Sequence, residues 1–327
     1  MGPRSARADG ARRVSVRVGV VGVGALGRHH ARVYADLAGA RLVGLVDSDP
    51  ARAAEVAARH RCRVFPSIAE MLPEVDAVSV AVPTVDHLRV ARVALEAGKD
   101  VLVEKPIATT LAEADELIAL AEARGAVLQV GHIERFNPAV EVLRRIQEPR
   151  LVEVHRLGAF SPRSLDIDVV LDLMIHDLDL VLSLDGTEAV QVDAVGVPVL
   201  TPRVDIANAR LRFSSGLIAN LTASRVSQDR VRKFRIFAPR TYVSADLAPR
   251  AAQVFRLREG GQGGWPEIQL EQSEAPDVPE SEPLRRQLEA FLHAVRTRTR
   301  PLVGGMDGRR ALALALEVLA RINEKRP

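Results

Sequence analysis

Val16-Arg17-Val18-Gly19-Val20-Val21-Gly22-Val23-Gly24-Ala25-Leu26-Gly27 is the most informative stretch of this chain. It predicts a buried, valine-rich strand that enters a glycine turn and then a helix beginning near Ala25. Gly22 permits the bend, Gly24 lets the backbone approach a pyrophosphate, and Gly27 lets the helix pack close to the strand. Phosphates bind at such a helix N-terminus because free N–H groups favour an anion. The dinucleotide-binding residues expected here are Gly22, Val23, Gly24, Ala25, Leu26 and Gly27.

A second apolar run, 41–46, supports this interpretation because it ends in an acidic residue. Asp47 lies 20 residues beyond Gly27, the separation at which a carboxylate accepts hydrogen bonds from the ribose of a dinucleotide. A carboxylate there repels a 2′-phosphate, so the sequence predicts NAD as cofactor and NADP as less favoured. The alternative is that Asp47 is a helix N-cap or a turn residue before Pro50.

Strand and helix patterns alternate from residue 16 to about residue 130. Apolar runs at 77–82, 100–103 and 127–130 alternate with helical patterns at 51–59, 86–97 and 111–124. Repeated units of this size are typical of a doubly wound parallel sheet. The sequence therefore predicts an NAD-binding Rossmann domain over 14–131, preceded by a disordered lead-in over 1–13.

The pattern changes after Gly131. Helices are predicted around 136–146 and at 169–184, with a strand at 151–160 between them. Further strands are predicted at 190–197, 206–213, 217–225, 232–237, 241–247 and 253–257. Short turns such as 214–216 indicate a large, open, mostly antiparallel sheet with one face free for a partner subunit.

These patterns define an α/β protein of two domains. The second domain is predicted over 132–283, as a substrate-binding and oligomerisation domain, with loops at 260–264 and 271–283. Two closing helices, 284–297 and 307–323, are predicted to return to the first domain and pack there.

Composition narrows the class of protein. The hydrophobic fraction of 47% and the charged fraction of 27% are ordinary for a soluble globular enzyme. Aromatic residues are 3% of the chain and no dense basic patch occurs, so nucleic acid is not an expected partner. No apolar run approaches the ~20 residues of a membrane-spanning helix, and 1–13 lacks the apolar core of a secretory signal. Cys62 is the only cysteine, which indicates a reducing cytoplasm and no cysteine-based metal site.

Ligands of an open parallel sheet bind beyond the carboxyl ends of its strands. Besides the glycine turn, two stretches meet that condition, and the expected cofactor contacts there are Pro83, Thr84, His87, Glu104 and Lys105. Lys105 lies between an acidic residue and a proline that fixes the chain direction, so it is placed to hold a hydroxyl or oxyanion. The alternative is a surface lysine paired with Glu104.

The run Asp172-Leu173-Met174-Ile175-His176-Asp177-Leu178-Asp179 holds a second candidate. Helical spacing places Asp172 and His176 on one face. An imidazole titrates near neutrality and can take a proton from a hydroxyl, while Asp172 could orient it or bind a second hydroxyl. The alternative is that His176 is an interior histidine of an amphipathic helix. A metal site from Asp172, His176 and Asp179 lacks a recognisable ligand pattern, and no metal is predicted.

The segment Gly131-His132-Ile133-Glu134-Arg135-Phe136-Asn137-Pro138 joins the two domains and is unusually polar for a strand exit. Its side chains are candidates to face the cofactor or a sugar. Alternatively, they cap and pair at a hinge. The substrate-binding candidates here are Glu134, Arg135, Phe136 and Asn137.

Gly22-x-Gly24-x-x-Gly27, Glu104-Lys105-Pro106 and Asp172-x-x-x-His176, in this order and at these separations, resemble the Gfo/Idh/MocA oxidoreductases, which act mainly on sugars and polyols. The resemblance covers nearly the whole chain beyond the first dozen residues. It implies a Rossmann domain followed by an α/β domain whose open sheet pairs subunits into dimers or tetramers. It also implies that Lys105 and His176 are the catalytic pair and that Asp172 acts on the substrate. Many members have a glycine shortly before the histidine where this chain has Met174 and Ile175, which indicates a different local backbone.

Within that family, the segment 131–138 is most similar to members that oxidise the 3-hydroxyl of UDP-N-acetylglucosamine and related nucleotide sugars. The resemblance therefore implies an NAD-dependent dehydrogenase of a nucleotide sugar, whereas the residues alone indicate only alcohol oxidation. A diphosphate needs cationic partners, and the candidates in the second domain are Arg163, Arg225, Arg230, Arg232 and Lys233. One alternative is a dehydrogenase of a free sugar or polyol such as inositol or glucose. Another is a non-catalytic regulator that senses NAD and has a partner protein.

Overall fold

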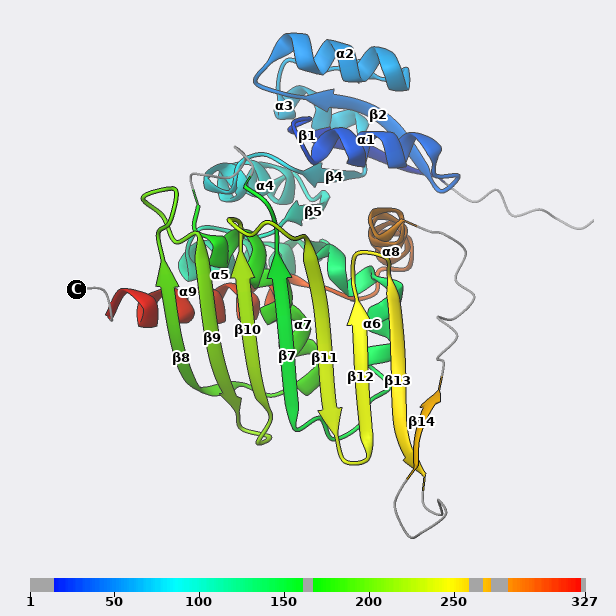
Figure 1. Ribbon diagram of the computed structural model, residues 1–327. Helices are drawn as coiled ribbons and strands as arrows, with labels where there is room; N and C mark the ends of the chain where they lie inside the picture. Colours follow the sequence, from blue (N-terminus) through cyan, green and yellow to red (C-terminus); the bar gives the residue numbers. More distant parts are fainter. Residues whose placement is uncertain (1–14, 161–166, 259–266, 272–281, 325–327) are drawn as a thin grey trace, which may run out of the picture.

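Strand β1 (Val16–Val21) lies at the centre of a six-stranded sheet with the order β3-β2-β1-β4-β5-β6. Every strand pair in it is parallel. The other strands are β2 (Ala40–Val46), β3 (Arg63–Val64), β4 (Ala77–Val80), β5 (Asp100–Glu104) and β6 (Leu128–Gly131). This computed structural model describes residues 15–160, 167–258, 267–271 and 282–324 (Figure 1). The predicted Rossmann sheet is confirmed, while the lead-in predicted over 1–13 and Arg163 lie outside the described residues.

Capping residues and turns set where helices of the first domain begin. Helix α5 starts with a capping box, in which Thr110 and Glu113 satisfy each other's backbone N–H groups. Helix α1 begins at Gly27, because residues 24–26 still form the turn. The helices are α1 (Gly27–Asp36), α2 (Pro50–His60), α3 (Ile68–Met71), α4 (His87–Glu96) and α5 (Leu111–Arg124), with 3-10 turns η1 (Leu72–Glu74) and η2 (Thr84–Asp86).

The second sheet has eight strands in the order β14-β13-β12-β11-β7-β10-β9-β8. Its strands are β7 (Leu151–Leu157), β8 (Ala189–Val197), β9 (Ile206–Phe213), β10 (Ile218–Ser224), β11 (Val231–Ala238), β12 (Thr241–Asp246), β13 (Ala251–Arg258) and β14 (Glu267–Glu271). The pair β7–β10 is parallel and the described neighbours otherwise run antiparallel. The predicted open, mostly antiparallel sheet is confirmed, and β14 is a strand that the sequence did not indicate.

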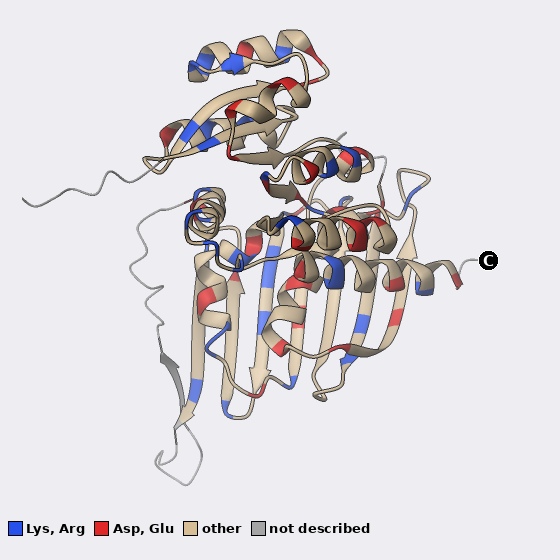
Figure 2. Cartoon of the chain, turned by 180° about the vertical axis from the view of Figure 1, so that it is seen from behind, with Lys and Arg blue, Asp and Glu red and all other residues tan. Residues whose placement is uncertain are grey.

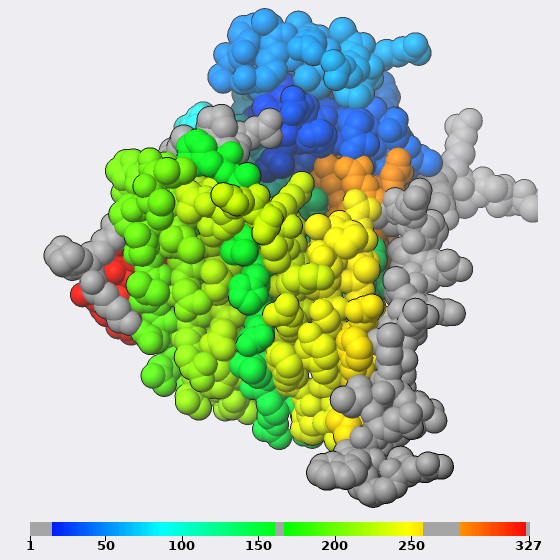
Figure 3. Space-filling view, viewed as in Figure 1, coloured from blue at the N-terminus to red at the C-terminus, as the bar shows by residue number. Residues whose placement is uncertain are grey.

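Among the described residues, helices cover one face of this sheet and leave the other without a helix (Figure 1). These helices are α6 (Pro138–Leu143), α7 (Ile175–Asp185) and α9 (Gly305–Glu324). In Figure 2, which views the molecule from behind, they lie in front of the sheet. Strand alternation explains the asymmetry, because in β9 every second side chain, from Ala207 to Phe213, is buried beneath the helices while those between are exposed. The opposite face is the surface seen in Figure 3. No helix within the described ranges is long and apolar enough to cross a membrane.

The two closing helices pack differently from one another. Helix α8 (Pro283–Thr297) places Leu288 and Phe291 in the core of the first domain with β1 and α1. We expected both helices to pack on that domain, but α9 bridges the two. Leu312 belongs to the first domain's core, whereas Leu314 and Val318 belong to the second's.

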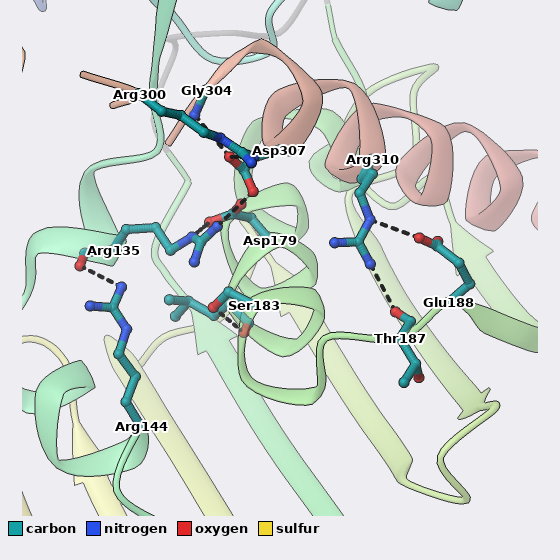
Figure 4. Close-up of polar contacts among 11 residues, drawn as sticks. Arg135, Arg144, Asp179, Ser183, Thr187, Glu188, Arg300, Gly304, Asp307 and Arg310 are labelled. Atoms are coloured by element: carbon teal, nitrogen blue, oxygen red, sulfur yellow. Dashed lines mark hydrogen bonds and ion pairs between the residues drawn. The ribbon is translucent and has the colours of Figure 1, made fainter. Parts of the chain in front are cut away.

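Polar contacts hold α9 against the domain junction (Figure 4). Asp307 lies 3.4 Å from the guanidinium of Arg135, which also donates to Asp179 at 2.9 Å. One turn further along, Arg310 donates to the Thr187 carbonyl at 2.9 Å and pairs with Glu188 at 2.8 Å. The junction between the domains is therefore fixed by directional contacts as well as by apolar packing.

Candidate active site

A cavity of about 400 Å³ lies where the two domains meet, within the size range of small-molecule sites. Both domains and the start of α8 contribute to this interdomain cavity. Its lining residues are Leu26, His29, His30, Glu104, Lys105, Ile133, Glu134, Asn137, His176, Arg230, Arg232, Leu247, Ala248, Arg250, Glu282, Pro283 and Leu284. Lys105 enters from the first domain and His176 from the second, so the structure brings the two predicted reactive side chains to one space.

Lys105 follows β5 and reaches across the junction. Its Nζ donates to the Asp172 carbonyl oxygen at 2.6 Å and lies 3.3 Å from that residue's Oδ1. The lysine side chain is only 11% exposed, so it is not a solvated surface lysine paired with Glu104. Its ammonium is a fixed donor that can hold an alcohol or alkoxide oxygen.

Glu104 has a different partner. Its carboxylate is buried and lies 3.1 Å from Nε2 of His30, whose Nδ1 is 2.7 Å from the Ser79 hydroxyl. Glu104 also accepts a hydrogen bond from the backbone N–H of Lys105 at 3.3 Å. The glutamate thus orients the strand end that carries Lys105.

His176 is the second residue of α7, directly after a π-helical turn, η4 (Val170–Met174). Asp172 lies in that π-turn and His176 in the α-helix that follows it, so the two residues do not belong to one regular α-helix. Asp172 does not line the interdomain cavity and instead contacts Lys105. Such π-turns are frequent at functional sites.

The surroundings keep His176 neutral. Burial and the nearby charges of Lys105 and Arg156 lower the pKa of His176 well below 6.5. Its Nδ1 is buried and has no hydrogen-bond partner among the described residues. Because the ring lines the cavity, Nε2 is the nitrogen that can meet a ligand, and a neutral ring can accept a proton there.

The glycine turn has the form that a pyrophosphate requires. Gly22 has a φ of +83°, and a Cβ on Gly27 would lie 1.7 Å from the Gly22 carbonyl oxygen, so both positions need glycine. A Cβ on Gly24 would meet no atom within 4 Å. That open space is where the backbone can approach a ligand, and the adjacent Leu26 is half exposed at the cavity edge. These residues fit a bound dinucleotide.

Asp47 is held by three donors. It accepts from the N–H of Val23 at 2.7 Å, from the N–H of Asp49 at 2.8 Å and from Arg52 at 2.5 Å. Burial acts to raise the pKa of Asp47, but these bonds outweigh it and the pKa is lowered, so the carboxylate is ionised. The N-cap of α2 is Asp49, which excludes the N-cap alternative for Asp47.

Three other expected cofactor contacts, Pro83, Thr84 and His87, differ in exposure. Pro83 and Thr84 lie at the exposed end of β4, where a ligand can reach them. His87, however, is buried, with Nδ1 2.8 Å from the Pro106 carbonyl oxygen and Nε2 3.0 Å from that of Val82. The assignment of His87 to the cofactor is therefore corrected: its ring joins two strand ends.

Side chains of the segment between the domains cap and pair with neighbouring groups. Arg135 is buried in its contacts with Asp179 and Asp307, and Phe136 lies in the first domain's core. Neither lines the cavity, so their assignment to substrate binding is corrected.

Glu134 and Asn137 do line the cavity, but they are also engaged. Glu134 pairs with buried Arg156 at 2.9 Å, and Asn137 donates to the Leu247 carbonyl at 2.9 Å. Arg156 in turn pairs with Asp177 at 2.7 Å. This buried network positions the cavity wall.

The cationic candidates divide into two groups. Arg225 bonds to Asp205 at 2.9 Å and Lys233 pairs with Asp246 at 3.0 Å, and neither lines the cavity, so we do not assign the diphosphate to them. Arg230 and Arg232 line the cavity, together with Arg250, which sequence reasoning missed. No sequence signal marked Arg250, because it follows a strand and is brought to the cavity only by the fold.

The fold and this site define an oxidoreductase built on a dinucleotide-binding domain. A model of the oxidoreductase family with an NAD-binding Rossmann fold matches residues 16–132, and a GFO/IDH/MocA C-terminal domain model matches residues 145–243. The chain belongs to the Gfo/Idh/MocA family, as its motifs indicated.

Relatives support this assignment. UDP-N-acetylglucosamine 3-dehydrogenase of Acidithiobacillus ferrooxidans is 45% identical over 93% of this chain and 96% of that protein. A crystal structure of that enzyme matches with a TM-score of 0.90, covering 96% of this chain and 100% of the other. An inositol 2-dehydrogenase of Rhizobium meliloti is 27% identical over 96% of this chain and 98% of that protein. A levoglucosan dehydrogenase in complex with NADH and levoglucosan, 18% identical, shares the fold with a TM-score of 0.84, covering 95% of this chain and 98% of the other.

We expect Gly24→Ala to weaken NADH binding by about tenfold or more, equivalent to about 1.4 kcal/mol. The added methyl group meets no protein atom, so the fold should persist, but it occupies the space that a pyrophosphate needs. Fluorescence titration with NADH measures the affinity, and thermal unfolding checks the fold. Unchanged affinity in a folded variant would contradict this use of the glycine turn.

Proposed function

We propose that this protein is an NAD-dependent dehydrogenase that oxidises the 3-hydroxyl of UDP-N-acetylglucosamine, or of a related nucleotide sugar, to a ketone. The observation that carries the proposal is the convergence of Lys105 and His176 on one cavity that also holds two arginines without an ion-pair partner in the described structure, Arg230 and Arg250. The similarity to UDP-N-acetylglucosamine 3-dehydrogenase supports the substrate class.

The two reactive groups would act on the same alcohol. Neutral His176 takes the hydroxyl proton at Nε2, while the Lys105 ammonium stabilises the developing charge on the oxygen. Asp172 holds the Lys105 side chain in place through the 3.3 Å contact. Bound NAD, held by the glycine turn and Asp47, supplies the acceptor for the hydride.

The diphosphate of the substrate would bind the arginines of the cavity. Arg230 is exposed and Arg250 is half-buried, and both can approach an anion without losing a resident carboxylate partner. Arg232 is 3.6 Å from Glu134, so it is partly neutralised already. We therefore assign the diphosphate chiefly to Arg230 and Arg250.

The preference for NAD over NADP would come from the net charge at the ribose site. Arg52 contacts both Asp47, at 2.5 Å, and Asp49, at 3.6 Å. Two carboxylates against one guanidinium leave a net negative charge, which repels a 2′-phosphate. A cytoplasmic location stays a prediction from the single cysteine.

The protein is further proposed to form a homodimer or homotetramer through the uncovered face of the second sheet (Figure 3). Three half-buried aromatic rings stack there, with centroids 4.9 Å apart for Phe237 and Tyr242 and 5.3 Å for Tyr242 and Phe255. Aromatic side chains are enriched at the centres of protein interfaces.

The first test is NADH formation with purified protein and UDP-N-acetylglucosamine, beside free N-acetylglucosamine, glucose and inositol, with NAD or NADP. We expect turnover with NAD and the nucleotide sugar only. Turnover of inositol or glucose alone would favour the polyol dehydrogenase. Tight NADH binding with no turnover of any substrate would favour the NAD-sensing regulator.

In the same assay, Arg250→Gln should raise KM for the nucleotide sugar by about 10- to 100-fold, the value of a charge-assisted hydrogen bond. NADH affinity should not change. Arg124→Gln, on the exposed face of α5, is the matched control and should leave both values unaltered. An unaltered KM in Arg250→Gln would contradict the diphosphate assignment.

Lys105→Ala and His176→Ala should each lower kcat by about 10²- to 10⁴-fold while retaining NADH affinity. Because the pKa of His176 is lowered, its proton-accepting form persists as the pH falls, so the acid limb of kcat/KM should lie below pH 6.5. His293→Ala, exposed on α8, is the control. Unchanged rates in both site variants would exclude the mechanism.

Light scattering should give a mass of two or four chains for the native protein. Tyr242→Glu places a charge within the aromatic stack, so it should lower that mass toward one chain. A monomeric native protein, or an unaffected assembly in Tyr242→Glu, would exclude this face as the interface.

A further inference from the structure

His132, directly after β6, is a buried histidine that has no part in the proposed proton or hydride transfer. Its exposed fraction is 0%, and neither ring nitrogen has a hydrogen-bond partner within the described ranges. Buried polar side-chain atoms nearly always have a partner, either in the protein or an ordered water. Two unpartnered nitrogens on one ring therefore require an explanation.

The ring next to His132 is that of His176. Their centroids are 6.2 Å apart and the rings are nearly perpendicular, at 89°. The Nδ1 of His176 is the third unpartnered buried nitrogen of this region. No direct hydrogen bond joins the two rings, although each has the capacity to make one.

The lack of a partner for Nδ1 of His176 matters because a neutral histidine that accepts a proton at one ring nitrogen must already carry a proton on the other. Which nitrogen of a neutral imidazole is protonated depends on the hydrogen bond that the second nitrogen makes. For His176 to accept at Nε2, its Nδ1 must hold the proton, and an acceptor must stabilise that N–H. Carboxylates and backbone carbonyls usually fill this role, but no described residue does so here.

We propose that His132 is the positioning residue for His176, acting through one buried water molecule that accepts from Nδ1–H of His176 and donates to a ring nitrogen of His132. The inference deepens the proposed function, since it rests on His176 as the base. A water molecule fits the chemistry of the site, because it needs polar partners and the two rings supply them. His132 itself cannot reach a ligand in the cavity, as it is fully buried and does not line it.

The neighbours of the pair favour neutral rings. Burial lowers the pKa of both His132 and His176. The charged groups that act on the two rings are Lys105, Glu104, Arg135, Arg156, Asp179 and Arg232. Neutral rings can each donate at one nitrogen and accept at the other, which the bridge requires.

The test compares two substitutions. His132→Phe keeps a flat ring but removes both nitrogens, and it should lower kcat by about 10- to 100-fold, the effect typical of losing a supporting hydrogen-bond partner. KM for the nucleotide sugar and NADH affinity should not change. His132→Gln retains a polar group that can hold the water, so it should recover most of the lost kcat. Thermal unfolding checks that both variants fold.

A second measurement does not depend on the substrate. In protein labelled with ¹⁵N-histidine, the two-bond proton–nitrogen NMR spectrum distinguishes the two neutral tautomers, and the loss of a signal set in His176→Ala identifies His176. We expect the Nδ1–H tautomer in the native protein and a shift toward Nε2–H in His132→Phe. His293→Phe, at an exposed position of α8 that does not line the cavity, should change no signal of His176.

The outcomes separate this inference from the proposed function. Finding the Nε2–H tautomer of His176 in the native protein would overturn the role of His132, whatever the substrate is. So would finding that His132→Phe leaves the tautomer of His176 unchanged. An equal loss of kcat in His132→Gln and His132→Phe would also overturn it. If no nucleotide sugar is turned over but the tautomer shifts as expected, the positioning role stands and only the substrate assignment fails.

Discussion

The contact between Lys105 and Asp172 is the constraint on which the site depends. The lysine belongs to the first domain and the aspartate to the second, so their 2.6 Å and 3.3 Å contacts join the domains at the point where chemistry is proposed. The lysine side chain is only 11% exposed, so the aspartate offsets the cost of burying its ammonium. Burial, and after it the same ammonium, lower the pKa of His176, so the position of Lys105 also bears on the protonation of the histidine.

A buried network of ion pairs lies on the helix that carries His176 and on the elements packed against it. Arg156 lies between Glu134 and Asp177 with almost no exposure, and Arg135 lies between Asp179 and Asp307. Removing one member would leave an unpaired buried charge, which typically costs about 3–5 kcal/mol. Asp177 and Asp179 belong to the helix of His176, while Asp307 belongs to α9, so the network sets the orientation of that helix relative to the junction (Figure 4). Because each buried charge needs its partner, the network restricts how the two domains can be arranged.

The parts that sequence predicted well are those determined by local pattern. The glycine turn, the parallel strands and the alternation of the second sheet follow from backbone conformation and burial, which neighbouring residues reveal. Arg135 was misassigned because its partners are 44 and 172 residues away in the chain, and a charged residue at a hinge looks like a ligand contact until those carboxylates are placed. Arg250 was missed because only the fold brings it to the cavity. The π-turn at 170–174 was also hidden, since its residues have an ordinary helical pattern.

The charges of the cavity further explain why a neutral base and a cationic lysine can coexist. Moving a proton to His176 beside Lys105 creates two neighbouring positive charges, which disfavours the protonated ring until the substrate oxygen carries negative charge. That oxygen, between the ammonium and the new imidazolium, then offsets the repulsion. In the proposed reaction, this arrangement would stabilise the developing charge more than the charge of the resting site, which is the condition for lowering a barrier rather than only binding a substrate.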